Sequence, residues 1–456
     1  MIHSSPLLAP RRAIRTAACL TASLLMLSGI LSAADPQPAL DQRPNAVAFR
    51  QMKHGIFIHN VYGLTGWPDD RKTATLDEFA NAFDVKTFAD QMAGMGVEYV
   101  YFTAWHKAMY LLGPNKAMEK WLPGHTAKRD LVGEIADALH AKKIKLVIYA
   151  HPNDFHDLTK EEQERIGFKM ASPDQNKLVN NLINEVFADM CMRYGKKTNV
   201  LGFWWDSWGG NGGCIDMPRL RATVLKNFPG AITLSQNYNP KFIDFLSIEG
   251  GGPPSVDAMA AYKNNLTFFT LGDWWSANRN SSWYHGRPLS PEAMYRFLLL
   301  NVGTGAPGGM CWAMSPLADG KTWPGDNQPL KVIQACGQQI APLRPTICNV
   351  LPSRNWLLPP NTTWPKAPAF VAARSQSNKS EFIHIIKPPA ERFIDLPKPV
   401  ESFSGARMYL SKKPVAISPQ GDGLRLTLPD GESWSELDTV IELAIKPDNA
   451  QAAPSP

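Results

Sequence analysis

Eight short apolar segments constrain the fold of this chain more than any other feature of its sequence. They lie at 55–59, 99–105, 145–151, 200–206, 231–236, 245–249, 266–273 and 310–314. Each is short and rich in aliphatic and aromatic residues, as buried parallel strands are, and segments with a helical repeat separate them. This alternation predicts a (β/α)8 barrel over residues 35–349.

The segments between the predicted strands carry the repeat and the end signals of helices. Asp84 can cap a helix in which Val85, Phe88, Ala89 and Met92 recur at helical spacing. Further helices are expected at 131–139, at 178–190 and from Ser290 onward, where a proline follows in the first turn.

The pattern changes beyond residue 350. Short alternating stretches lie at 370–373, 381–386, 424–428 and 439–443, with proline and glycine between them and no helix-length repeat. This pattern predicts a C-terminal antiparallel β-sandwich over residues 350–446. The tail, 447–456, is rich in proline and alanine, and we expect it to be disordered.

The N-terminus has the features of an export signal. Arg11, Arg12 and Arg15 precede an apolar run at 17–31, and the small residues Ser32 to Ala34 offer a cleavage site. A twin-arginine signal is the less favoured alternative, since its flanking residues fit poorly. We therefore expect a signal peptide at 1–34 and a secreted or periplasmic protein. No other apolar run is long enough to span a membrane.

Composition excludes several classes of protein. With 456 residues, 44% hydrophobic residues and 14 Trp, the chain can fill one large core and an accessory domain. The net charge of +6 is not clustered, and no nucleic-acid-binding motif is present. The positive charge also suits an anionic polysaccharide. Five cysteines beyond residue 34 do not form a zinc or disulfide pattern, although one or two bridges are allowed, and Cys336 and Cys348 are the closest pair in sequence.

The fourth apolar segment ends abruptly in a carboxylate, Asp206, next to Trp204, Trp205 and Trp208. The active sites of such barrels form at the carboxyl ends of the strands. An acid surrounded by aromatic rings at that place is typical of a site where rings hold a sugar and a carboxylate attacks its anomeric carbon. The alternative is a helix-capping aspartate beside core tryptophans.

Several motifs resemble, in order and spacing, the α-L-fucosidases of glycoside hydrolase family 29. They lie at 53–59, 81–84, 96–106, 129–134, 203–206, 308–320 and 438–443, so the resemblance runs from about residue 50 to 445. It implies a barrel followed by a sandwich and a retaining exo-glycosidase that acts on oligo- or polysaccharides, for which we expect no cofactor. It also implies that Asp206 is the nucleophile and that His59 binds the sugar.

The chain departs from the family pattern at two places. Asn60 stands where the family usually has a tryptophan after the first-strand histidine. The usual Lys-His-His-Asp-Gly motif is replaced by Trp105, His106, Lys107, Ala108 and Met109. The resemblance therefore implies the fold and the reaction more strongly than fucose itself, and a related sugar, such as a sulfated one, stays open.

The remaining candidate residues have structural alternatives. Glu249 is the first candidate for the general acid and Asp273 the second, and either carboxylate can instead cap a loop or pair with a surface cation. His106 is a candidate sugar ligand, and Lys107 can pair an anionic group or be an ordinary solvated lysine. The candidate stacking platforms, for which core packing is the alternative, are Trp204, Trp283 and Trp312.

The segment 151–157 holds several polar side chains at one strand end, but no second ligand cluster accompanies it, so we expect no metal site. Two other functions stay open. One is a carbohydrate-binding protein without hydrolytic activity, and the other is a metal-dependent barrel hydrolase that uses this segment. Asp206 favours the glycosidase, because binding alone does not need a carboxylate at the anomeric carbon. The sequence does not determine the oligomeric state.

Overall fold

The computed structural model describes residues 39–69, 71, 74–206, 213–236, 242–249, 266–271, 290–359 and 367–447. For residues 41, 248–249 and 266–271 the description covers the backbone only. The predicted signal peptide and the end of the chain, 448–456, lie outside the described residues.

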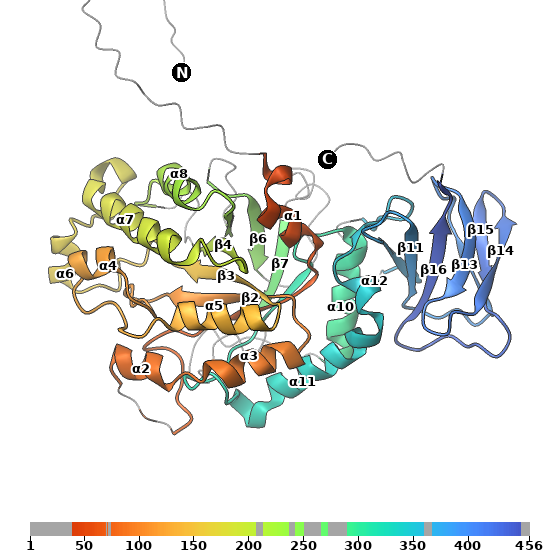
Figure 1. Ribbon diagram of the computed structural model, residues 1–456, viewed down its shortest axis with the longest axis horizontal. Helices are drawn as coiled ribbons and strands as arrows, with labels where there is room; N and C mark the ends of the chain where they lie inside the picture. The colour runs from red at the N-terminus through yellow and green to blue at the C-terminus, as the bar shows by residue number, and fades with distance from the viewer. Residues whose placement is uncertain are drawn as a thin grey trace, which may run out of the picture. The chain divides into compact units, whose positions relative to one another are not determined.

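The predicted eight-stranded barrel is confirmed. Its strands are parallel, follow one another in chain order and close where β1 pairs with β8 (Figure 1). Their bounds are β1 His54–Ile58, β2 Tyr99–Trp105, β3 Lys145–Ala150, β4 Val200–Trp205, β5 Ile232–Ser235, β6 Phe245–Glu249, β7 Leu266–Leu271 and β8 Met310–Ala313.

Helices cover the outside of the barrel (Figure 1). Those between and after its strands are α2 Leu76–Ala82, α3 Val85–Gly94, α4 Lys116–Trp121, α5 Leu131–Ala141, α6 Lys160–Arg165, α7 Lys177–Tyr194, α8 Met217–Asn227, α10 Pro291–Thr304, α11 Pro324–Ile340 and α12 Arg344–Ile347; α1 Pro44–Gln51 precedes β1. The predicted caps are present: the side chain of Asp84 accepts from the N–H of Thr87, and that of Ser290 from the N–H of Ala293.

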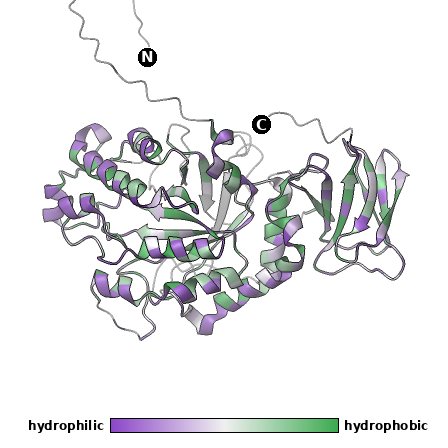
Figure 2. Ribbon diagram, in the orientation of Figure 1, coloured by the Kyte–Doolittle hydropathy of each residue, from purple (hydrophilic) through white to green (hydrophobic). Residues whose placement is uncertain are grey.

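Two hydrophobic clusters hold the barrel together. The interior cluster fills the barrel and includes Phe57, Tyr149 and Trp204. The outer cluster lies between strands and helices and includes Trp205 and Trp312. Successive side chains of a strand point to opposite faces, so Trp204 and Trp205 enter different clusters. Figure 2 shows the matching pattern on α5 and α7, which carry hydrophobic residues on one side and hydrophilic residues on the other.

The second sheet is antiparallel, with the order β12-β15-β14-β13-β16-β11-β10-β9. The bounds are β9 Leu351–Pro352, β10 Phe370–Arg374, β11 Ser380–Ile385, β12 Phe393–Leu396, β13 Phe403–Met408, β14 Pro414–Gln420, β15 Gly423–Thr427 and β16 Thr439–Ile445. Side chains from its two ends, such as Ile383 on β11 and Leu426 on β15, share one hydrophobic cluster. The sheet therefore folds over onto itself, as in the predicted sandwich.

Buried hydrogen bonds connect the second sheet to the barrel helices. The hydroxyl of Tyr295 on α10 donates to Oδ2 of Asp438 (2.7 Å), and Nδ1 of His384 on β11 lies 2.7 Å from the same oxygen. Nε2 of His384 lies 3.1 Å from the carbonyl of Thr346 on α12. These hydrogen bonds join the two parts of the chain.

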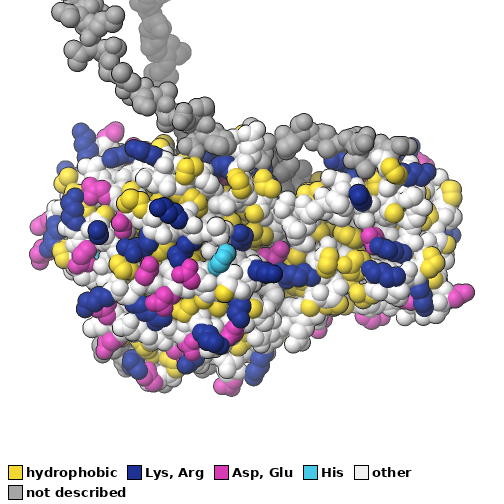
Figure 3. Space-filling model, in the orientation of Figure 1, with side chains coloured by type: hydrophobic (Ala, Val, Ile, Leu, Met, Phe, Trp, Pro, Cys, Tyr) yellow, Lys and Arg dark blue, Asp and Glu magenta, His cyan; other side chains and the backbone are white. Residues whose placement is uncertain are grey.

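The described surface carries mixed charge, and the described cysteines form no disulfide. On the face drawn in Figure 3, basic and acidic side chains are interspersed, so the positive net charge does not form one patch there. All five cysteines in the described part of the chain are buried and free, Cys336 and Cys348 included. No described helix is long and apolar enough to cross a membrane.

Candidate active site

Strand β4 places Asp206 at the carboxyl end of the barrel. The N–H of Asp206 donates to the carbonyl of Ala150 at the end of β3 (3.0 Å), and its side chain is only 7% exposed. The close pairing of β4 with β5 requires Gly202, since a Cβ there would lie 2.0 Å from the carbonyl oxygen of Ile232. The carboxylate thus stands at a fixed place on a rigid strand.

Tyr149 on β3 holds this carboxylate. Its hydroxyl donates to Oδ2 of Asp206 at 2.5 Å, and its ring stacks on Trp204 with centroids 4.9 Å apart. Oδ1 of Asp206 has no hydrogen-bond partner among the described residues. One carboxylate oxygen is therefore fixed, and the other is available to a ligand.

Two buried histidines lie close to the carboxylate, and a third lies next to one of them. One ligand atom each of His106, His151 and Asp206 lies within 4.8 Å of the others. The ring of His59 lies 5.1 Å from that of His106, and its Nδ1 is 3.1 Å from the hydroxyl of Thr103. Burial lowers the pKa of His59 and of His151 below the ordinary range, so both are neutral at pH 7.

The hydrogen bond from Tyr149 gives a testable prediction. We expect Tyr149→Phe to lower kcat by about 10-fold to 100-fold, because the carboxylate loses a charge-assisted hydrogen bond while the ring stays in place. Steady-state rates on an aryl glycoside measure this. The matched control is Tyr99→Phe. Tyr99 also belongs to the interior cluster but lies at the start of β2, away from Asp206, and its hydroxyl donates a buried hydrogen bond to the carbonyl of Gly308. Equal losses of kcat in both variants would show a general effect on packing.

Lys107 lies beside His106 in a strained turn. Lys107, Ala108 and Met109 have φ angles of 34°, 51° and 58°, in the left-handed region that side chains disfavour. Such residues cost of order 1 kcal/mol or more each, and they persist where the surroundings hold them in place. Met109 is fully buried, and the ring of His125 contacts the carbonyl of Ala108 at 2.8 Å. The N–H of Lys107 donates to Nδ1 of His106 (2.8 Å), which fixes both residues.

The other predicted residues are placed as follows. Trp204 belongs to the interior cluster beneath the carboxylate, whereas Trp312 belongs to the outer cluster and is fully buried there. Glu249 ends β6, but only its backbone is described. Asp273 and Trp283 lie outside the described residues. The structure therefore brings together Asp206, His59 and His106, and Lys107 is adjacent.

The sequence did not single out Tyr149, and it pointed to Asp154 only as one of the polar side chains of the segment 151–157. Tyr149 lies two residues before His151, and the alternation of β3 could have placed its side chain in the interior with Val147. Asp154 is fully buried, and its Oδ2 is 3.6 Å from Nδ1 of His106. Its burial could not be predicted, since a loop residue gives no periodic signal.

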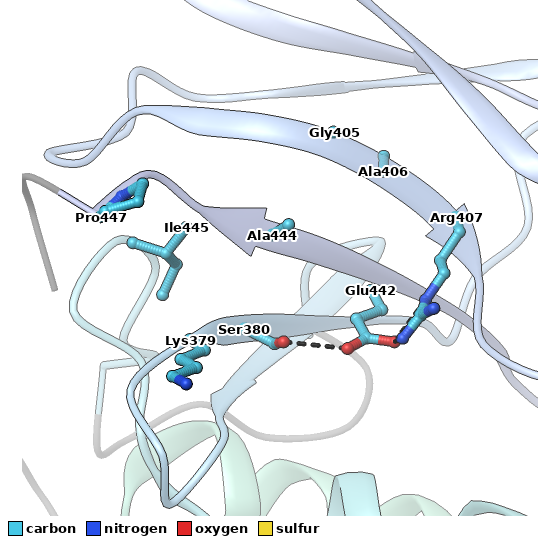
Figure 4. A pocket seen from close by; sticks show the side chains of 9 residues that line it. All are labelled: Lys379, Ser380, Gly405, Ala406, Arg407, Glu442, Ala444, Ile445 and Pro447. Atoms are coloured by element: carbon cyan, nitrogen blue, oxygen red, sulfur yellow. Dashed lines mark hydrogen bonds and ion pairs between the residues drawn. The ribbon is translucent and has the colours of Figure 1, made fainter.

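A hollow of about 800 Å³ lies on the second sheet, at some distance in sequence from these residues (Figure 4). Arg407 in it pairs with Glu442 at 2.8 Å, and Ser380 donates to the same carboxylate. No aromatic ring is among the described residues that line it. The hollow therefore has no platform for a sugar, and its arginine is already paired.

The barrel region of the chain is similar to known proteins. The family model described as alpha-L-fucosidase matches residues 66–286, which include β2 to β7 and Asp206. A curated relative, tissue alpha-L-fucosidase from Bos taurus, is 25% identical over 29% of this chain. The match spans only 34% of the length of that bovine protein.

Solved structures share the fold over most of both chains. An alpha-L-fucosidase of family GH29 from Bacteroides thetaiotaomicron has a TM-score of 0.66 and 14% identity, covering 91% of this chain and 98% of its own. Alpha-L-fucosidase isoenzyme 1 from Paenibacillus thiaminolyticus has a TM-score of 0.65 and 17% identity, covering 88% and 99%. The chain therefore resembles α-L-fucosidases over residues 66–286 and shares the fold of solved GH29 fucosidases over most of its length.

Proposed function

We propose that the protein is a secreted, retaining exo-glycosidase with Asp206 as its nucleophile, acting on fucose-containing or related glycans. One observation carries this proposal. Asp206 is a buried carboxylate at the carboxyl end of a barrel strand, with one oxygen held by Tyr149 and the other without a hydrogen-bond partner among the described residues. That is the arrangement that a carboxylate needs in order to attack an anomeric carbon.

The reaction proceeds in two displacements. Oδ1 of Asp206 attacks the anomeric carbon and forms an ester as the glycosidic C–O bond breaks, and the leaving oxygen takes a proton from the general acid. Water then attacks the same carbon, gives its proton to the former acid and releases Asp206. Each displacement inverts the carbon, so the product retains the configuration of the substrate.

The charges of the pocket suit the transition state of this reaction. The anomeric carbon becomes positive as the bond to the leaving group breaks. The carboxylates of Asp206 and Asp154 lie buried near this point, while His59 and His151 are neutral. A negative, water-poor site stabilises such a cation more than the neutral ground state.

Glu249 remains the first candidate for the general acid. Its strand, β6, lies two positions from β4 around the barrel, and Glu249 is the last residue of that strand. A residue there stands at the same rim as Asp206. Retaining glycosidases need the two carboxyl groups about 5–5.5 Å apart. Asp273 remains the alternative.

Lys107 supports the proposal of an anionic substrate. Lys107 follows His106 in the strained turn and is half-buried, and its ammonium group forms no ion pair with a described carboxylate. The residue that the family motif would place next, an aspartate, is Ala108 here, so a group that repels anions is missing. We infer that a sulfated or uronate-containing glycan is preferred over a neutral one.

This preference can be measured directly. We expect Lys107→Met to lower kcat/KM on a sulfated substrate by about 10-fold or more, since a charge-assisted hydrogen bond is lost, and to leave the neutral substrate nearly unchanged. Paired assays on the neutral and sulfated forms of one glycoside make the comparison. Equal losses on both, or none, would show that Lys107 is ordinary surface charge.

Secretion is part of the proposal and rests on the N-terminal segment alone. The charged and apolar stretches at 11–31 support it. N-terminal sequencing of protein exported from a bacterial host would reveal cleavage near residue 34.

A further inference from the structure

Two buried carboxylates of the pocket form no ion pair with a described lysine or arginine. Asp154 is fully buried, and Asp206 is 7% exposed. No described lysine or arginine forms an ion pair with either, and the ion-pair contacts of Asp154 are to His106 at 3.6 Å and to His156 at 3.9 Å. Neither oxygen of Asp154 has a hydrogen-bond donor among the described residues. Buried charges without partners are costly, so this part of the pocket attracts a cation.

The side chains around this charge are of the types that bind metal ions in proteins. His106, His151 and Asp206 each present one ligand atom within 4.8 Å of the others, and all three are buried. Nδ1 of His151 and Oδ1 of Asp206 have no hydrogen-bond partner in the described part of the chain. Two imidazoles and one carboxylate form a donor set typical of divalent transition metals, and Zn²⁺ suits it with a fourth position left open.

Asp154 has the place of an outer carboxylate. A metal-binding histidine usually donates its second ring N–H to a carboxylate, which orients the ring and raises its basicity. His106 now accepts from the N–H of Lys107 at Nδ1, so a neutral His106 carries its proton on Nε2. Binding an ion through Nε2 moves this proton to Nδ1, where Oδ2 of Asp154 is 3.6 Å away. The ring must then give up its hydrogen bond from the N–H of Lys107 and rotate toward Asp154.

We propose that a divalent transition-metal ion such as Zn²⁺ binds between His106, His151 and Asp206 and inhibits the enzyme. The binding site stands on these residues alone. The inhibition rests on the proposed function, because an ion on Oδ1 of Asp206 occupies the lone pair that attacks the sugar. The proposed site departs from the expectation of no metal site at 151–157. The expectation of a cofactor-free reaction is unchanged, because the ion acts as an inhibitor.

A neighbouring group provides the control. Asp154, His156 and Asp157 also lie within 4.8 Å of one another, but the side chains of His156 and Asp157 are 61% and 34% exposed. If an ion used this outer group, His156 would be required and His151 would not. The pair of variants His151→Ala and His156→Ala therefore separates the two positions.

The protein without its predicted signal peptide is titrated with Co²⁺, and binding is monitored by visible absorption. A second titration with Zn²⁺ is monitored by calorimetry. We expect one ion per chain, nearly complete loss of binding in His151→Ala and little change in His156→Ala. Asp154→Asn should weaken binding by about 10-fold to 100-fold, as for other outer ligands. Thermal melting of each variant without metal checks its folding, and His151→Gln replaces the alanine variant if that one is unfolded.

Competition in the wild-type protein tests the proposal without any variant. Zn²⁺ should raise the apparent KM for an aryl glycoside and leave kcat unchanged, and L-fucose should weaken Zn²⁺ binding. Absence of binding, or binding that needs His156 instead of His151, would overturn the site. Binding without competition, or activation by the ion, would overturn the inhibition. If the protein hydrolyses no glycoside, the titrations still decide the site while the proposed function fails.

Discussion

Asp206→Asn should reduce turnover by on the order of 10⁴-fold or more, because the substitution removes the attacking oxygen and its charge while keeping the size of the side chain. The amide can still receive the hydrogen bond from Tyr149 and keep its place at the end of β4. We therefore expect the fold and the binding of sugar to survive. Steady-state rates on an activated aryl glycoside measure the loss.

Two controls make this result interpretable. Thermal melting and equilibrium binding of L-fucose should be close to those of the wild type, which separates loss of chemistry from loss of structure. In Asp206→Gly, added azide should occupy the vacated space and form a glycosyl azide of inverted configuration. Full activity of Asp206→Asn would refute the assigned role of this residue.

The second large effect is expected for Glu249→Ala. A general acid contributes about 10²-fold to 10⁴-fold where the leaving group needs a proton. The variant should therefore lose most activity on natural oligosaccharides and much less on aryl glycosides with a good leaving group. Added azide should partly restore turnover, because it attacks the glycosyl ester without a general base. Rates over a series of leaving groups measure this dependence.

Asp273→Ala is the matched variant for this test. It removes the other candidate carboxylate, and we expect its rates to vary with the leaving group as those of the wild type do. If the rates of Glu249→Ala depend on the leaving group as those of the wild type do, and the rates of Asp273→Ala do not, then Asp273 is the general acid and β6 provides no catalytic carboxylate.

Much of the fold could be predicted from the sequence, because the barrel depends on local patterns. The segments at 99–105 and 245–249 were predicted with the bounds that β2 and β6 have in the structure. Asp84 and Ser290 begin helices as expected, since capping needs only a side chain and an N–H three residues later. The sandwich was predicted because its strands alternate clearly and no helix interrupts them.

The site could be predicted only in part, because its contacts join different strands. Asp206 could be recognised from its position after an apolar run. The bond from Tyr149 to Asp206 depends on the register between β3 and β4, in which Tyr149 lies beside Trp204. The sequence does not contain this register in any local pattern. The burial of Asp154 depends on a loop after β3, for which periodicity gives no information.

Trp312 shows how strand alternation could have narrowed the choice of platforms. Its neighbours Cys311 and Ala313 face the interior of the barrel, so Trp312 faces the helices. Counting inward positions along β8 would have placed it in the outer cluster. Its role as a stacking platform stays a prediction, and its position favours packing.

The stereochemistry of the first product tests the central claim most directly. A covalent intermediate on Asp206 requires two inversions at the anomeric carbon. Proton NMR of the reaction mixture, recorded before the released sugar mutarotates, distinguishes the two anomers. We expect the first-formed sugar to have the anomeric configuration of the substrate. An inverted sugar would mean that water attacks directly, and it would contradict the assignment of Asp206 as nucleophile.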